Sequence, residues 1–364
     1  MKWRFVWLTC LLCGILPLVG CWDAKDIDNR MIVGAMGVER PEKDKPSVRV
    51  WFRFPIPKTP GTSGNGSDFF ATSQAGDTVI DATNQMRYRL PKALDLSSVR
   101  AFLIDETMAK EGLRQYLDFT VRERSVPLDT VVALVTGDMN QIFSNPNPTG
   151  ELSGLYTKLF FEPFAGGIPR KNKVELWEVY AKLYNPLQAN LIPLVRESEH
   201  NMFSLVGNAY FAGDKLAGIL TPDETLLYEI ISRSIGETEM ELTKKADVKI
   251  LNNRTRIKAS LKADGHPLIR VTSRVDCTLV NSSGEERLSA SRIEQYLEQK
   301  LIRQAAGLFA KTQAKRSDIF GFGNHFRGKL AVSRYPSWPS MYQQAEIRFK
   351  IKVKLRNTGL EYLE

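Results

Sequence analysis

The stretch 346-EIRFKIKVKLR-356 alternates apolar and basic side chains without a break. Successive side chains of a β-strand point to opposite faces of the sheet. One face therefore carries Ile347, Phe349, Ile351, Val353 and Leu355, and the other carries Arg348, Lys350, Lys352, Lys354 and Arg356. The pattern predicts a half-buried strand near the C-terminus. Its basic side is either a solvated outer face whose lysines protect a sheet edge, or a contact surface for anionic lipid or an acidic partner.

The segment before this strand has the period of a long amphipathic helix, beginning at Ser289 or Ser291. Its apolar positions recur at helical spacing and are Ile293, Leu297, Leu301, Ala305, Leu308 and Thr312. We expect this face of the helix to lie across a sheet. Residues 238–262 and 267–280 alternate over lengths that suit long antiparallel strands of that sheet.

Upstream of these strands, residues 203–220 predict a β-hairpin with its turn at Gly213-Asp214. Thr221 then offers a helix N-cap, Pro222 the first helical position and Glu224 the third. A helix is expected to follow directly.

The first half of the chain alternates strand-like and helix-like segments. Strands are expected at 31–39, 47–54, 98–104, 130–136 and 191–195, and helices at 77–89, 108–121, 152–161 and 173–184. In the first helix Asp77 is the expected N-cap, with Val79, Ile80, Thr83 and Met86 on one face. In the last helix Leu176, Trp177, Tyr180 and Leu183 are expected to be core.

These elements indicate an α+β protein with antiparallel β-sheets packed by helices, in two to three domains. The polar stretch 196-RESEHN-201 is the expected main boundary. We predict a leader at 1–20, an N-terminal α+β region at 21–198 and a C-terminal α+β domain at 199–364. A break near 144–150 allows two subdomains in the first region.

The N-terminus has the features of an export signal. Lys2 and Arg4 precede an uncharged stretch, 5–20, which is shorter than the roughly 20 apolar residues of a membrane span. The stretch ends in 18-LVGC-21, which resembles a bacterial lipobox. By that resemblance Cys21 would carry a diacylglyceryl group and become the first mature residue. The alternative is a plain membrane helix with an incidental cysteine.

The amino-acid composition limits how the protein can be stabilised and which partners it can bind. The chain has 4 Cys, and only Cys277 lies beyond the leader and Cys21. A disulfide scaffold is therefore excluded, and Cys277 is expected to be a lone core thiol. The net charge of +9 fits either attraction to anionic lipid or acidic partners, or a merely solvated surface. We do not expect a nucleic-acid partner, because the basic residues are spread out and lack aromatic interleaving.

The motifs of common enzymes are missing from the sequence. His200, His266 and His325 have no neighbouring ligand at metal-site spacing, and no G-x-S-x-G or G-x-x-x-x-G-K-[ST] occurs. The segment 317-SDIFGFGNHFRG-328 begins like a dinucleotide fingerprint but has Phe326 in place of the third glycine. We interpret it as a structured turn that Asp318 could cap. No catalytic residue, metal or cofactor is predicted.

Three segments carry a resemblance to a known family. The start 20-GCWDAKDI-27, the segment 207-GNAYFAGDKLAGILTPDET-225 and 317-SDIFGFGNHFR-327 followed by Trp338 resemble the Ger(x)C family of spore germination lipoproteins. One departure is Asp26 before Ile27, where a glutamate is expected. The family assigns no catalytic residues, so only Cys21, the lipid-anchor position, is carried over.

The resemblance implies a non-enzymatic C subunit of a nutrient germinant receptor. It would be anchored to the outer face of the spore inner membrane beside multispanning A and B subunits, with an α+β fold of up to three domains. The rival hypotheses are a solute-binding lipoprotein that delivers a nutrient to a membrane transporter, and an exported enzyme such as a cell-wall hydrolase. Phe69, Phe70 and Trp338 are candidate partner contacts, with buried packing as the alternative.

Overall fold

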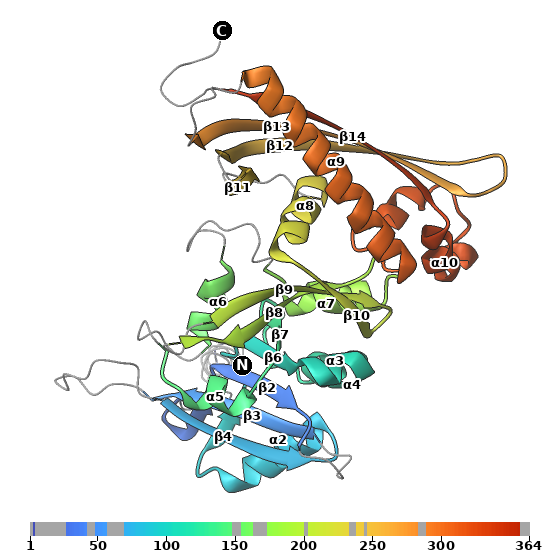
Figure 1. Cartoon of the computed structure of the whole chain (residues 1–364). Helices are drawn as coiled ribbons and strands as arrows, with labels where there is room; N and C mark the ends of the chain where they lie inside the picture. Colours follow the sequence, from blue (N-terminus) through green and yellow to red (C-terminus); the bar gives the residue numbers. More distant parts are fainter. Residues whose placement is uncertain are drawn as a thin grey trace.

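The computed structural model describes Trp3 and the ranges 27–41, 48–56, 69–147, 154–162, 173–199, 203–232, 238–243, 246–282 and 289–356. The leader at 1–20 and Cys21 thus lie outside the described residues, apart from Trp3. Within these ranges the chain forms two main sheets with helices packed on them (Figure 1).

The first sheet has eight strands in the order β10-β9-β8-β7-β6-β2-β3-β4. Their bounds are β2 Ala35–Glu39, β3 Val48–Pro55, β4 Phe69–Gly76, β6 Ala101–Asp105, β7 Val131–Val135, β8 Leu191–Glu197, β9 Phe203–Ala212 and β10 Lys215–Leu220. Two short strands, β1 Arg30–Ile32 and β5 Ala93–Asp95, form a separate parallel pair. The 3-10 helix η2 Ile27–Asn29 directly precedes β1. The strands β2, β6 and β7 are almost wholly buried, which places the core of the first half around them.

Helices alternate with these strands along the chain. Their bounds are α2 Val79–Arg89, α3 Glu106–Glu111, α4 Arg114–Arg122, α5 Met139–Ser144, α6 Leu155–Phe161 and α7 Leu176–Leu183. Helices α3 and α4 connect β6 to β7, and α5, α6 and α7 connect β7 to β8. Each of these connected pairs is parallel, as is β2 with β6.

The prediction of antiparallel sheets is therefore wrong for the centre of the first sheet. A chain that crosses over through a helix re-enters the sheet in the same direction, whereas a short turn reverses it. The outer pairs, β2 with β3, β3 with β4, β8 with β9 and β9 with β10, are antiparallel. The α+β class itself is confirmed.

The second sheet has the order β11-β12-β13-β14. The bounds of its strands are β11 Thr238–Thr243, β12 Ala246–Leu261, β13 Pro267–Ser282 and β14 Glu346–Leu355. The helices of this half are α8 Pro222–Ser232, α9 Ala290–Ala314, η5 Phe322–Phe326, η6 Val332–Ser337 and α10 Trp338–Gln343. The pair β12 and β13 is antiparallel, as predicted, but β14 runs parallel to β13 because the chain returns through α9. The predicted strand 238–262 is divided into β11 and β12.

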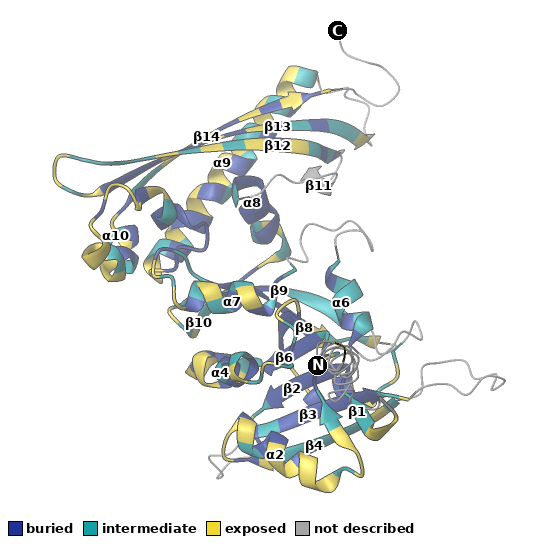
Figure 2. Cartoon of the chain, turned by 180° about the vertical axis from the view of Figure 1, so that it is seen from behind, coloured by how far each residue is buried: buried dark blue, intermediate teal, exposed yellow. Residues whose placement is uncertain are grey.

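The long helix and the last strand behave as their periodicity predicts. Ser289 is the N-cap of α9, and its side chain accepts a hydrogen bond from the Arg292 N–H. Every predicted apolar position of this helix is buried. Along β14 the apolar side chains are buried or half-buried and the basic ones are exposed. Figure 2 shows the result: dark, buried ribbon between α8, α9 and the sheet, and exposed residues alternating along β14.

The hairpin and helix start at 203–224 are also confirmed. Gly213 adopts a φ of 64° in the turn between β9 and β10. Thr221 and Glu224 form a reciprocal capping box, in which each side chain accepts a hydrogen bond from the other residue's backbone N–H, at 2.8 and 3.2 Å.

Two helices of the first half differ from the prediction. Thr78, rather than Asp77, caps α2, and Ile80 is 44% exposed while Ala82 is buried. The helix predicted at 108–121 is two helices, because Gly112 has a φ of 141° and ends α3.

The aromatic stripe expected on α7 is the clearest error among the helices. Trp177 is 51% exposed, and its indole N–H donates to a Glu175 carboxylate oxygen at 2.8 Å. The buried face of α7 consists of Leu176, Val179 and Leu183.

The first sheet continues past the predicted boundary between residues 198 and 199. Strands β8 and β9 pair with each other across this position. The hairpin β9–β10, expected in the C-terminal domain, therefore forms one edge of the first sheet and lies next to α8 (Figure 1).

Candidate functional site: the joint at Asp318

The predicted anchor residue, Cys21, lies outside the described residues, and its role stays a prediction. The structure instead draws attention to the segment that carries the third family motif. Residues 317–327 follow α9 and contact residues 185–190, which link α7 to β8 in the first half. We call these two segments, together with Trp338, the joint.

Direct hydrogen bonds connect the two sides of the joint. The Ala189 N–H donates to the Asp318 backbone carbonyl at 2.8 Å. The Ser317 hydroxyl donates to the Phe211 carbonyl of β9 at 2.6 Å, and the Asn324 amide donates to the Gln188 side-chain oxygen at 3.1 Å. Because backbone and side-chain groups both take part, the joint fixes the second half against the first sheet.

A single buried carboxylate organises the turn, as the sequence suggested. Asp318 is 3% exposed and accepts hydrogen bonds from the backbone N–H groups of Phe322 at 3.1 Å and Gly323 at 2.8 Å. The Trp338 indole N–H donates to the same carboxylate at 2.9 Å. Burial raises the pKa of the Asp318 carboxyl to about 6, against the opposing effect of these donors.

Two glycines are required in this turn for different reasons. Gly321 has a φ of 68°, in the left-handed region that favours glycine. A Cβ atom on Gly323 would lie 2.6 Å from both the Leu187 carbonyl oxygen and the Trp338 Nε1 atom. Only a residue without a side chain lets the two sides of the joint approach this closely.

Aromatic side chains fill the space around the turn. Phe320 and Phe322 stack at 5.0 Å between ring centroids, and Phe326 lies 4.9 Å from Trp338. Trp338 is completely buried, so of its two predicted roles packing is the correct one. The motif thus combines a polar centre with an apolar surround.

The sequence indicated the turn and its cap but not its contact with residues 185–190. The stretch 185-NPLQAN-190 contains turn-forming residues and no functional motif. Its partner lies far along the chain, so no local pattern could have identified the contact.

A groove of about 320 Å³ opens beside the joint. It is lined from the first half by residues that include Arg114, Tyr184 and Gln188, and from the second half by Arg316 and Trp338 among others. The Arg114 guanidinium lies 5.1 Å from the centroid of the Tyr184 ring. The groove is wide enough for a small molecule, but its lining contains no arrangement of nucleophile, base and oxyanion donor.

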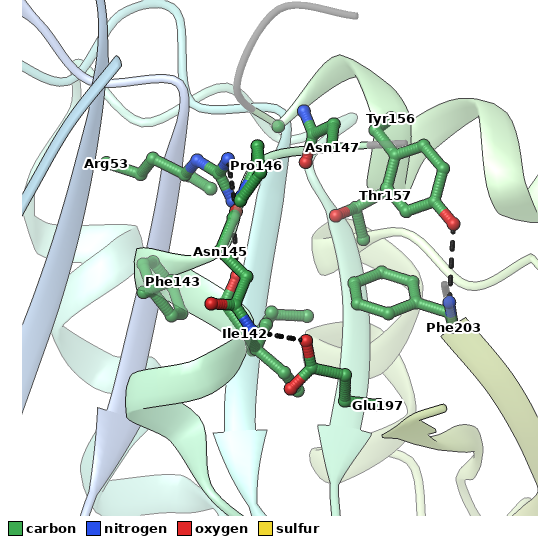
Figure 3. Close-up of a pocket in the computed structure, with 13 residues that line it drawn as sticks. Arg53, Ile142, Phe143, Asn145, Pro146, Asn147, Tyr156, Thr157, Glu197 and Phe203 are labelled. Carbon is green, nitrogen blue, oxygen red and sulfur yellow. Dashed lines mark hydrogen bonds between the residues drawn. The ribbon is translucent and has the colours of Figure 1, made fainter. Parts of the chain in front are cut away.

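A second, narrower pocket lies under the first sheet at Arg53 (Figure 3). Arg53 is 5% exposed and donates to the backbone carbonyls of Ile142 at 3.1 Å and Asn145 at 2.8 Å. Its guanidinium also lies 3.7 Å from the centroid of the Phe69 ring, whereas Phe70 is 45% exposed. Burial lowers the pKa of Arg53 to about 10, which still leaves it charged at neutral pH.

The Arg53 pocket has room for about one water molecule, with a volume of about 20 Å³. Glu197 lies on the opposite wall, where the Asn145 side-chain amide donates to one carboxylate oxygen at 2.7 Å (Figure 3). The other Glu197 oxygen and the Arg53 Nε atom are buried without a partner among the described residues. This pocket is suited to a bound water and not to a nutrient-sized ligand.

Three other features bear on function: the single thiol beyond Cys21, possible metal sites and possible membrane spans. Cys277 is fully buried, and burial raises its thiol pKa to about 12, as expected for a core thiol. In the part of the chain that the structure describes, no cluster of three or more His, Cys, Asp or Glu side chains could hold a metal ion. None of the helices described there is both long and apolar enough to cross a membrane.

Comparisons with known proteins agree over both halves of the chain. The family described as "Spore germination protein N-terminal domain" matches residues 23–197, and "Spore germination B3/ GerAC like, C-terminal" matches residues 206–359. The chain belongs to the Ger(x)C family. The resemblance carried by the three sequence segments is thereby confirmed.

Individual relatives support the same assignment. Spore germination protein B3 of Bacillus subtilis (strain 168) is 20% identical over 365 aligned positions, which cover 95% of this chain and 96% of that protein. The putative spore germination protein YfkR of the same organism is 26% identical over 144 positions, which cover 38% and 36% of the two chains. The crystal structure of the GerBC protein shares the fold, with a TM-score of 0.54 at 16% identity over 91% of this chain and 99% of that one.

Proposed function

We propose that this Ger(x)C chain is a lipid-anchored, non-catalytic subunit of a membrane germinant receptor, required for spore germination in response to nutrients. The observation that carries the proposal is the match of both family domains, which together extend from residue 23 to residue 359. The first match begins just after Cys21, the residue that the lipobox resemblance marks for acylation. We place the chain on the outer face of the spore inner membrane.

Substitution of the anchor residue tests this placement. Cys21→Ala should release the protein from spore membranes and impair germination by nutrients, while germination by nutrient-independent agents survives. Cys13→Ala is the matched control, because it changes a leader cysteine and leaves the lipobox intact. A Cys21→Ala strain with a normal nutrient response would count heavily against the proposal.

Assembly with multispanning A and B subunits is the mode of action that we propose. The joint supports it, since it gives the ectodomain a fixed relationship between its two halves through bonds such as Ala189 to Asp318. Crosslinking of the full chain in native spore membranes should recover both subunits. Recovery of neither, under conditions where the chain stays in the membrane, would contradict this part of the proposal.

Among the described residues, the groove beside the joint favours a solute-binding protein instead. Such proteins close two lobes about a hinge, however, and the hydrogen bonds of Ser317 and Asn324 across the joint oppose a hinge there. Calorimetry of the protein with candidate nutrients separates the two functions. Saturable heat at micromolar ligand would favour the solute-binding alternative.

A further inference from the structure

The outer face of the second sheet is densely cationic. Its exposed basic side chains are Arg254, Arg256 and Lys258 of β12, Arg270 and Arg274 of β13, and Arg348, Lys350, Lys352, Lys354 and the adjoining Arg356 of β14. We call these residues the basic face. It covers three neighbouring strands and so extends well beyond the alternation that the sequence of β14 alone predicts.

The register places like charges directly opposite one another. Lys258 pairs with Arg270, which pairs with Arg348, and four residues further along each strand Arg254 pairs with Arg274, which pairs with Lys352. Like charges in directly opposed cross-strand positions destabilise a sheet. Folding therefore gains nothing from these two rows, and another role must explain them.

Protection of the sheet edge does not account for the basic face. The backbone N–H groups of Val353 and Leu355 on the edge strand donate to Glu298 and Glu294 of α9, at 3.0 and 2.8 Å. The helix thus already occupies that edge. Moreover Arg254, Arg270 and their neighbours lie on β12 and β13, inside the sheet, where no edge needs protection.

Few of these cations are neutralised. Among the described residues, ion pairs reach the basic face only as Arg356 with Asp276, Arg348 with Glu346 and Lys352 with Glu298. The face also points away from the rest of the molecule, because α8 and α9 cover the opposite side of the sheet and α8 contacts β9 of the first sheet (Figure 1). It is therefore free to meet a partner beyond the second sheet.

The chemistry of the face limits what that partner can be. Protein interfaces concentrate their binding energy in buried aromatic and large apolar side chains, and of the described residues on this side of the sheet only Val280, near the end of β13, is an exposed large apolar one. A bilayer holding Cys21 would meet the chain from the other half, since η2 leads directly into β1, which contacts β3 of the first sheet. Neither an acidic globular protein nor that bilayer fits well.

A flexible polymer with a regularly repeated anion does fit. Along β14 the cations follow one another every second residue, about 6.6 Å apart, and neighbouring strands lie about 4.8 Å apart. We propose that the basic face binds a linear anionic polysaccharide with a carboxylate or phosphate in its repeat unit. The proposal rests on the proposed function, which places the chain outside the membrane.

The test measures binding of fluorescein-labelled polygalacturonate to the full chain in neutral detergent, by fluorescence anisotropy. The triple variant Lys350→Glu, Lys352→Glu, Lys354→Glu should bind about tenfold more weakly or worse, and the wild-type affinity should fall steeply with salt. The control is Lys92→Glu, Arg124→Glu, Lys215→Glu, which changes the net charge equally at exposed positions away from the second sheet. It should bind as the wild type does.

Several results would overturn the proposal. They are equal binding by the triple variant and the wild type, an equal loss in the control, or tighter binding of poly-L-glutamate, or of phosphatidylglycerol added to the detergent micelles, than of polygalacturonate. The triple variant should unfold at nearly the same temperature as the wild type. Lys352→Glu relieves the like-charge contact with Arg274 but loses the ion pair with Glu298, and Lys354→Glu places a second carboxylate opposite Asp276. None of these measurements depends on acylation of Cys21, so failure here leaves the proposed function standing.

Discussion

The indole N–H of Trp338 donates a hydrogen bond to the carboxylate of Asp318 at 2.9 Å, and both side chains are buried. The bond joins the first residue of α10 to the turn that follows α9. Two backbone N–H groups of the turn meet the same carboxylate. The charge of Asp318 is thus held by donors from two separate segments, and removal of any donor should weaken the joint.

Trp338→Phe should lower the free energy of unfolding by about 2 to 4 kcal/mol, because it removes a hydrogen bond to a buried charge and leaves a small cavity. Urea unfolding measures the change. Trp177→Phe is the matched control: Trp177 is 51% exposed, and its N–H bond to Glu175 lies at the surface. The control should change stability by less than about 0.5 kcal/mol. Equal losses in both variants would contradict a special role for the Asp318 bond.

The pKa of Asp318, raised by burial to about 6, predicts a pH dependence of stability. The folded chain binds this proton more tightly than the unfolded chain, whose aspartate has a pKa near 4. The contribution of this group to stability is therefore fully present below about pH 4 and is lost as the pH rises through about 6. A shift of about two pKa units corresponds to about 3 kcal/mol at most.

Asp318→Asn should remove this dependence, which urea unfolding at pH 4 to 7 can measure. Other carboxylates act in the opposite direction; for example, the pKa of Asp129 is lowered by the hydrogen bond from Lys158. The informative quantity is therefore the difference between wild type and variant at each pH, with Asp129→Asn as the control. A wild-type advantage over Asp318→Asn that does not shrink between pH 4 and pH 6 would refute the raised pKa.

The best predicted parts of the fold are those whose signal lies within one element. The strict alternation of β14 and the helical spacing from Ile293 to Thr312 each identify a buried face, because burial of one face is a local property of the element. The cap at Ser289 and the capping box at Thr221 are equally local. Such features can be predicted because each depends on residues no more than about four positions apart.

The parts that were missed depend on partners far along the chain. Periodicity does not say which strand lies beside β7 or in which direction it runs, so the parallel centre of the first sheet was not predicted. Trp177 counts as apolar by composition, but its N–H makes a surface hydrogen bond. In the joint, Asp318 was identified as a cap. Its contact with Ala189, however, joins two segments far apart in the chain, and no sequence pattern in either segment predicts it.

Gly323 should tolerate no side chain. In Gly323→Ala the new Cβ atom would lie 2.6 Å from the Leu187 carbonyl oxygen, a backbone atom that cannot move without shifting the other side of the joint. We expect a loss of about 1 to 3 kcal/mol in the free energy of unfolding. Gly328→Ala is the control, because nothing lies within 4 Å of its Cβ position. If the two variants unfold alike, the close approach is not a constraint.

Cys277 should be chemically silent in the folded protein. Its thiol is fully buried, and burial raises its pKa to about 12, so almost no thiolate is present at neutral pH. Iodoacetamide should modify Cys277 in urea but not in native buffer, as measured by mass spectrometry of the peptide that contains it. Rapid modification of the native protein would show that β13 opens readily.

Arg53 affects the free energy of unfolding in two opposite ways. Its burial without a carboxylate partner costs solvation energy, as its lowered pKa shows, yet its guanidinium satisfies the carbonyls of Ile142 and Asn145 at the end of α5. Arg53→Met keeps the apolar stem and removes both donors.

We expect the unsatisfied carbonyls to dominate in Arg53→Met, with a loss of about 1 to 3 kcal/mol in urea unfolding, because leaving a buried acceptor unpaired costs more than a typical hydrogen bond contributes. Arg87→Met is the control, since Arg87 is a surface cation paired with Glu123 at 3.0 Å, and should change stability by at most about 1 kcal/mol. An Arg53→Met protein as stable as the wild type would mean that desolvation of the guanidinium offsets everything its hydrogen bonds contribute. The Arg53 pocket would then persist for a reason other than stability.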